Sequence, residues 1–209
     1  MEVRADDGTL GSAARQRAPK APLCTLVIFG AGGDLTKRLL MPAIYNLAKD
    51  KLLSDNFAII AVDRTPKPID AYRDYLAEGI RSFVSDTAAG PATEPFDAQA
   101  WDFVASRISH FAGDLTQSDT YARLHETLEK TATRHQTGGN AVFYLAVAAQ
   151  LFGTIVDQLG AAGLAREQNG SFRRVIIEKP FGTDLASARA LNAVGILGLK
   201  FQDRPSRTL

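Results

Sequence analysis

A glycine-rich segment near the start of the chain has the composition of a phosphate-binding turn. The residues Gly30-Ala31-Gly32-Gly33-Asp34-Leu35 follow an apolar run and precede a helical pattern. Glycines let the backbone turn tightly and let a diphosphate approach, while the amides and the positive dipole of the next helix attract the anion. The segment is not a complete G-x-G-x-x-G motif, because Leu35 occupies the third glycine position, and it is not a P-loop. It predicts a dinucleotide site; the alternative is a tight turn in which Asp34 caps the helix.

A second candidate pair, Asp63 and Arg64, ends the next apolar run. An acid at this point of a dinucleotide-binding fold hydrogen-bonds the adenosine ribose hydroxyls and favours NAD. A neighbouring arginine pairs with the 2′-phosphate of NADP and stacks on adenine. Because both residue types are present, the pair leaves the choice between NAD and NADP open. A structural role at the strand end is the alternative.

A lysine follows the last apolar run, in Glu178-Lys179-Pro180-Phe181-Gly182. Ligands of open parallel sheets bind beyond the carboxyl ends of the strands. Lys179 is therefore placed to reach a substrate phosphate or hydroxyl together with the cofactor. A strand-end salt bridge is the alternative.

The remaining side chains with catalytic potential form no recognisable set. His110 lies in an apolar run, and His125 and His135 lie on one helical pattern, so each is expected to be structural or solvated. No Ser-His-Asp or metal-ligand spacing occurs, and no metal is expected. The single cysteine, Cys24, excludes an internal disulfide and fits a reducing compartment.

Alternating apolar runs and helical patterns must position these residues. Strands are expected at 23–29, 57–62, 108–112, 141–147 and 174–177. Helices are expected at 35–53 with an interruption at Pro42, and at 70–84, 98–107, 118–135 with Ser118-Asp119 as its cap, 150–162 and 184–193, and a surface loop at 85–95. Repeated strand–helix units predict an α/β fold with a doubly wound parallel sheet, that is, a Rossmann-like dinucleotide-binding domain.

Composition limits the other possibilities. The 209 residues carry a formal net charge of +1, which argues against a nucleic-acid partner held by a basic surface. The apolar runs are far shorter than the ~20 residues that span a bilayer, so we expect no membrane segment and a cytoplasmic location. Residues 1–22 lack aromatic residues and apolar periodicity and are expected to be a disordered leader.

Three segments together resemble the glucose-6-phosphate dehydrogenases. Gly30 to Leu47 looks like the coenzyme fingerprint of that family, Phe143 to Val147 resembles its fourth coenzyme-domain strand, and Glu178 to Gly182 matches its E-K-P-F-G. Their order and spacing agree from about Leu23 to Asn192. We therefore expect a dinucleotide-binding domain at 23–192.

The resemblance implies a function and a set of contacts. Members of the family oxidise glucose 6-phosphate to 6-phosphogluconolactone with NADP, at the entry to the pentose phosphate pathway, and a histidine accepts the C1 hydroxyl proton. Lys179 would contact glucose 6-phosphate and the nicotinamide end of the cofactor, and Arg64 the 2′-phosphate and adenine. Asp114 and Leu115 would border the adenosine. The pyrophosphate would be lined by Gly30, Ala31, Gly32, Gly33, Asp34 and Leu35.

The chain departs from the family at several positions. Gly32 stands where Ser or Thr is frequent, which removes a hydroxyl donor to a phosphate, and Asp63 puts a strict preference for NADP in doubt. Ala148-Ala149 stand where a proline is frequent.

The largest departure follows Asn192, where the family continues to R-I-D-H-Y-L-G-K and to an antiparallel-sheet domain that carries the catalytic histidine. Residues 193–209 do not match, which we interpret as a truncated or frameshifted reading frame that lacks the catalytic domain. The chain is thus expected to bind cofactor, to be incomplete for catalysis, and not to form the homo-oligomer typical of the family. The alternative is a non-catalytic NAD(P)-binding module.

Overall fold

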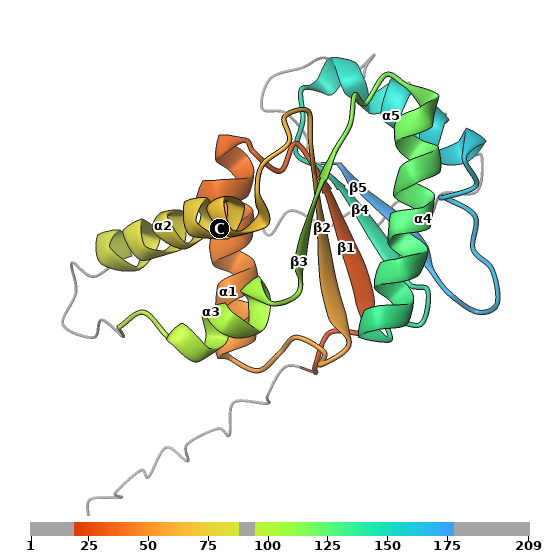
Figure 1. The fold of residues 1–209 in the computed structure, drawn as a ribbon. Coiled ribbons are helices and arrows are strands. Elements are labelled where there is room, and N and C mark those ends of the chain that lie inside the picture. The colour runs from red at the N-terminus through yellow and green to blue at the C-terminus, as the bar shows by residue number, and fades with distance from the viewer. Residues whose placement is uncertain (1–18, 88–94, 178–209) are drawn as a thin grey trace, which may run out of the picture.

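The fold is a five-stranded parallel sheet with helices on both faces (Figure 1). The computed structural model describes residues 19–87 and 95–177. The strands are β1 (Cys24–Phe29), β2 (Phe57–Asp63), β3 (Ile108–Ala112), β4 (Ala141–Leu145) and β5 (Arg173–Ile177), in the order β3-β2-β1-β4-β5. The helices are the π-helix η1 (Thr36–Leu40), α1 (Met41–Lys49), α2 (Ile69–Thr87), α3 (Ala98–Ala105), α4 (Ser118–His135), the 3-10 helix η2 (Ala149–Leu151) and α5 (Phe152–Ala161). The predicted doubly wound α/β class is confirmed.

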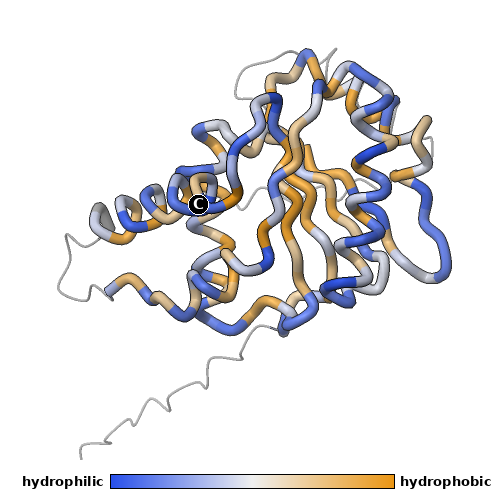
Figure 2. The backbone as a smooth tube through the Cα atoms, in the orientation of Figure 1, coloured by the Kyte–Doolittle hydropathy of each residue, from blue (hydrophilic) through white to orange (hydrophobic). Residues whose placement is uncertain are grey.

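The central strands alternate between two cores. Ile28 and Ile59 belong to the core under α1, α2 and α3, whereas Val27, Phe29 and Ile60 belong to the core under α4 and α5. Successive side chains of a strand point to opposite faces, and both faces are covered, so these strands are continuously apolar. Figure 2 shows the sheet as an apolar layer between helices with many hydrophilic residues.

The first helical segment continues past Pro42 instead of stopping there. Residues 36–40 form a π-helix, and α1 begins at Met41, so Pro42 lies in the first turn of an α-helix. A proline has no amide hydrogen to donate, and a widened turn accommodates that loss. α1 ends at Lys49, four residues before the predicted end of this segment.

Three other expectations need correction. α2 ends at Thr87, three residues beyond its expected end, so residues 85–87 are helical and not part of the expected loop. β4 ends at Leu145 rather than at residue 147, because its pairing partner on β1, Phe29, is the last residue before that strand turns away at Gly30. The expected cap of α4 is wrong as well: Ser118 is the first helical residue, and the preceding Gln117 makes no capping hydrogen bond through its side chain. The remaining strand bounds and those of α3, α4 and α5 differ from the expectations by at most two residues.

Several predictions fall outside the described residues. These are Lys179, the helix at 184–193, the tail at 193–209, and most of the leader and of the 85–95 loop. Within the expected leader, the amide of Ala21 donates to the carbonyl of Leu52 (2.7 Å) and Lys20 pairs with Asp55 (3.4 Å). Among the helices of the described ranges, none combines the length and apolar character that crossing a bilayer requires.

Candidate functional site

A cleft of about 490 Å³ lies at the carboxyl ends of the central strands. β1 pairs with β2 on one side and with β4 on the other, so the strand order reverses here, and ligands of doubly wound folds bind at this switch point. Loops that follow β1, β2, β3 and β4 all contribute to it. The lining residues are Gly30, Gly32, Gly33, Asp63, Arg64, Asp114, Leu115, Thr116, Ala146, Val147, Ala148 and Leu151.

Gly30 begins the turn in a conformation that other residues rarely adopt. Its φ is +82°, and a Cβ at this position would overlap the carbonyl oxygen of Ala146 and lie 2.9 Å from Cγ1 of Val147. A glycine is therefore required for β1 to turn this close to the end of β4.

Only some of the amides in the turn remain available to an anion. The amides of Gly30 and Ala31 both donate to the carbonyl of Val62 at 3.0 Å. The amide of Gly33 donates to the carbonyl of Gly30. The amide of Lys37 donates to the carbonyl of Gly33 at 3.2 Å, so the amides just before it lie in the open first turn of the helix. A phosphate would meet these first-turn amides rather than those of Gly30 and Ala31.

Two tyrosines of α2 donate hydrogen bonds to main-chain carbonyls of the glycine turn. The hydroxyl of Tyr72 donates to the carbonyl of Ala31 (2.9 Å), and that of Tyr75 donates to the carbonyl of Gly32 (3.2 Å). Burial, together with the charge of Asp63, raises the pKa of Tyr72 well above its usual range, so its hydroxyl stays a donor. Neither tyrosine was predicted from the sequence as a site residue. Their i,i+3 spacing, which puts both on one face of a helix, is the pattern that could have indicated them.

Asp63 and Arg64 enter the cleft from the end of β2. The Asp63 carboxylate accepts a hydrogen bond from the amide of Arg64 (2.8 Å) and lies 3.7 Å from Nζ of Lys67. Its main-chain carbonyl accepts from the amide of Gly113 (2.9 Å), which continues the pairing of β2 with β3. Lys67, four residues after Asp63 in the loop before α2, is a further site residue that was not predicted from the sequence.

Asp114 and Leu115 follow β3 and reach the same cleft. The Asp114 carboxylate accepts hydrogen bonds from the amide (2.9 Å) and the hydroxyl (2.8 Å) of Thr116. These two bonds, with a smaller contribution from the charge of Arg64, lower the pKa of Asp114. The Arg64 charge therefore acts on Asp114, a carboxylate that follows a different strand.

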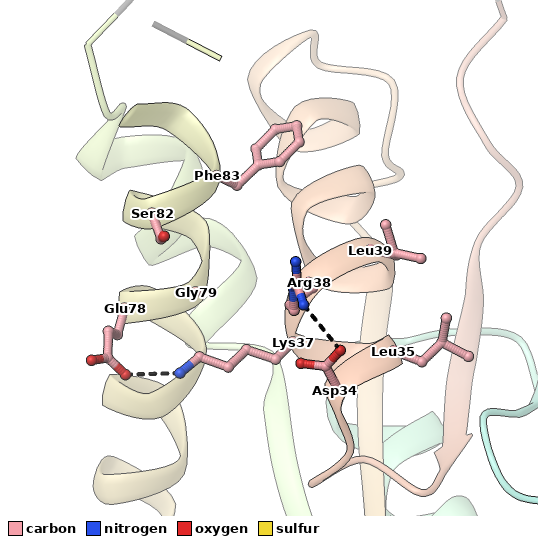
Figure 3. Close-up of a pocket in the computed structure, with 9 residues that line it drawn as sticks. All are labelled: Asp34, Leu35, Lys37, Arg38, Leu39, Glu78, Gly79, Ser82 and Phe83. Carbon is pink, nitrogen blue, oxygen red and sulfur yellow. Dashed lines mark hydrogen bonds and ion pairs between the residues drawn. The ribbon is translucent and has the colours of Figure 1, made fainter. Parts of the chain in front are cut away.

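The side chains of three predicted pyrophosphate residues do not face the cleft. Ala31 is fully buried in the core. Asp34 and Leu35 line a separate groove of about 770 Å³ between η1 and α2 (Figure 3), where Asp34 pairs with Arg38 at 3.5 Å. Contact of Asp34 or Leu35 with a phosphate would run through their main-chain amides, whereas the amide of Ala31 is already bonded to Val62.

None of the three histidines lines the cleft. His110 lies in β3 with its ring 4.9 Å from that of Tyr72, and burial lowers its pKa. His125 and His135 lie on α4. Within residues 19–87 and 95–177, no group of three or more metal-binding side chains comes together.

A parallel sheet with a glycine turn at its switch point, and with an acid and an arginine after the second strand, defines the class of Rossmann-type NAD(P)-binding domains. The chain belongs to the family described as "Glucose-6-phosphate dehydrogenase, NAD binding domain", whose model matches residues 27–198.

Named relatives agree with this assignment. The chain is 40% identical over 178 residues to "Glucose-6-phosphate 1-dehydrogenase 2" of Mycobacterium tuberculosis H37Rv, which covers 85% of this chain and 33% of that protein. It is 35% identical over 176 residues to "Glucose-6-phosphate 1-dehydrogenase" of Chlamydia muridarum, with 83% and 33% coverage. The chain thus spans about a third of the length of these relatives.

Solved structures have the same fold. The glucose-6-phosphate 1-dehydrogenase of Mycobacterium avium superposes with a TM-score of 0.68 at 32% identity, covering 86% of this chain and 35% of that one. A glucose-6-phosphate dehydrogenase in complex with its substrate glucose-6-phosphate gives 0.66 at 25% identity, with 85% and 34% coverage.

Proposed function

We propose that the cleft binds a nicotinamide dinucleotide and that the chain serves as the coenzyme-binding part of a glucose-6-phosphate dehydrogenase. In such a protein, glucose 6-phosphate would be oxidised to 6-phosphogluconolactone with NADP, in the cytoplasm, at the entry to the pentose phosphate pathway. The observation that carries the proposal is the convergence of four loops on one cleft at the switch point of the sheet.

Different parts of the cleft would bind different parts of the cofactor. The first-turn amides after Gly33 would hold the pyrophosphate, and Arg64, Asp114 and Leu115 would surround the adenosine. The bound cofactor would accept the hydride, while the protein supplies position. Lys179 would position the sugar phosphate beside the nicotinamide, as the family resemblance implies.

Replacing Ala148 with glutamate tests the location of the site. Ala148 is exposed and lines the cleft, so the new carboxylate would repel the pyrophosphate without disturbing the core. We expect the dissociation constant of NADP, measured by calorimetric titration, to rise about tenfold or more, the effect of one repelled charge or lost charged hydrogen bond. Ala98→Glu, at an exposed position of α3, is the matched control and should bind NADP as the unchanged chain does. Equal affinities in all three proteins would place the dinucleotide elsewhere.

Arg64→Ala tests the preference for NADP. A charge-assisted hydrogen bond to the 2′-phosphate contributes about 1.5–3 kcal/mol, and NAD has no such group. The variant should therefore lose roughly tenfold or more in affinity for NADP and much less for NAD, as measured by titration with each cofactor. Equal losses for both would mean that Arg64 does not contact the 2′-phosphate.

One observation favours a second candidate function. Among the described residues that line the cleft there is no histidine, the residue that accepts the C1 hydroxyl proton in the family. A non-catalytic NAD(P)-binding module would need only the cleft. Titration of the cofactor-loaded chain with glucose 6-phosphate separates the two functions, because a non-catalytic module has no need to bind the sugar phosphate.

A further inference from the structure

The carboxylate of Asp63 is fixed directly against the glycine turn. The Arg64 amide and the Lys67 ammonium hold it there, and its side chain is 21% exposed. A carboxylate accepts about four hydrogen bonds, so acceptor capacity remains toward the cleft that Asp63 lines.

Gly32 makes room for this carboxylate. A Cβ at Gly32 would overlap Oδ2 of Asp63 and would lie 3.3 Å from Nζ of Lys67. No positive φ is involved at Gly32, so the end of the Asp63 side chain is what a side chain at this position would meet first. The two positions are therefore sterically coupled: any larger residue at 32 must displace the Asp63 carboxylate from the turn.

The charges at this end of the cleft balance. Asp63 and Asp114 are the two carboxylates, the charge of Arg64 acts on Asp114, and Lys67 is engaged with Asp63. A 2′-phosphate brings about two further negative charges to this place, whereas the ribose hydroxyls of NAD bring two neutral donors. The site is thus less favourable to NADP than its arginine alone predicts.

We propose that Asp63 selects the cofactor, accepting hydrogen bonds from the adenosine ribose of NAD and repelling the 2′-phosphate of NADP, and that Gly32 is the glycine that lets it do so. This inference rests on the proposed dinucleotide site. It makes the chain bind NAD alongside NADP, with Arg64 and Asp63 acting in opposite directions.

The test is the ratio of two dissociation constants, measured for NAD⁺ and NADP⁺ by calorimetric titration of the 209-residue chain. Asp63→Asn keeps the shape of the side chain and removes its charge. We expect the affinity for NADP⁺ to rise about tenfold, because a like-charge repulsion disappears. The affinity for NAD⁺ should fall severalfold, because a charged hydrogen bond to the ribose disappears. The pair with Lys67 is long (3.7 Å) and only partly buried, so its contribution to stability is small, and the variant should melt as the unchanged chain does by circular dichroism.

Asp55→Asn is the matched control. It removes the same charge from an exposed side chain just before β2, at the opposite end of the strand from Asp63. It should leave both constants unchanged.

Gly32→Ser tests the coupling. The serine should displace the Asp63 carboxylate and shift the ratio toward NADP⁺, in the same direction as Asp63→Asn. In the double variant the two effects should not add, because each removes the same carboxylate from the turn. If the effects of Gly32→Ser and Asp63→Asn add in full, the coupling is wrong.

The outcomes separate this inference from the proposed function. If Asp63→Asn changes both affinities by the same factor, Asp63 is merely structural and the selectivity proposal is wrong, while the dinucleotide site stands. If the unchanged chain binds neither nucleotide, both proposals are wrong.

Discussion

Replacing Gly30 with alanine is expected to lower the free energy of unfolding by about 3 kcal/mol or more. A non-glycine residue at a φ of +82° costs about 1–3 kcal/mol. The added Cβ would press on the main chain of Ala146, directly after β4, and on Val147, which adds an overpacking cost of about 1–3 kcal/mol. Neither neighbour moves easily, because the amide of Ala146 is bonded to the carbonyl of Phe29 (2.9 Å). Urea unfolding followed by circular dichroism measures the change.

Gly153→Ala is the matched control for that substitution. Gly153 lies in α5, and a Cβ there would meet nothing within 4 Å. The same chemical change should raise stability there by about 0.4–1 kcal/mol, because alanine restricts the unfolded chain and favours a helix. If Gly30→Ala and Gly153→Ala have the same free energy of unfolding, the close approach of β1 to β4 is refuted. A variant at Gly30 also cannot report on the pyrophosphate alone, since it disturbs the sheet itself.

The 209-residue chain, purified alone, is expected to show no measurable oxidation of glucose 6-phosphate although it binds cofactor. General-base catalysis typically contributes about 10²–10⁴-fold, and His110, the histidine nearest the turn, packs against Tyr72 rather than facing the cleft. Loss of substrate positioning adds to this, because effective molarities of well-held reactants reach about 10⁵ M.

The measurement follows NADPH absorbance with glucose 6-phosphate in excess, after circular dichroism has confirmed folding. Turnover that disappears in Lys179→Ala would overturn the prediction and would require a base within this chain. His110→Ala would then be the first variant to test that role.

The amino-acid sequence determined the class of fold because burial leaves a local pattern. β1 and β2 are buried central strands of the sheet, and their positions could be predicted from apolar runs alone. The glycine turn could be predicted from three glycines between an apolar run and a helical pattern, although a tight turn that binds no ligand has the same pattern. Arg64, Asp114 and Leu115 were predicted in the cleft and do line it, Asp114 and Leu115 on the strength of the family resemblance.

Only the tertiary structure decided which way the turn residues face and which of their amides are free. The sequence treats Gly30 to Leu35 as one segment, yet Ala31 packs into the core, Asp34 and Leu35 line the neighbouring groove, and two amides bond to Val62 on β2. The end of β4 likewise depends on where β1 stops pairing.

The contact between Gly32 and Asp63 is the clearest case of this kind. The two residues lie on different loops, and neither the spacing nor the residue types indicates that the carboxylate of one occupies the space left by the missing side chain of the other. Hydrophobic periodicity is a local property and can be read along the chain, whereas a steric contact between loops exists only once the strands have set the loops side by side.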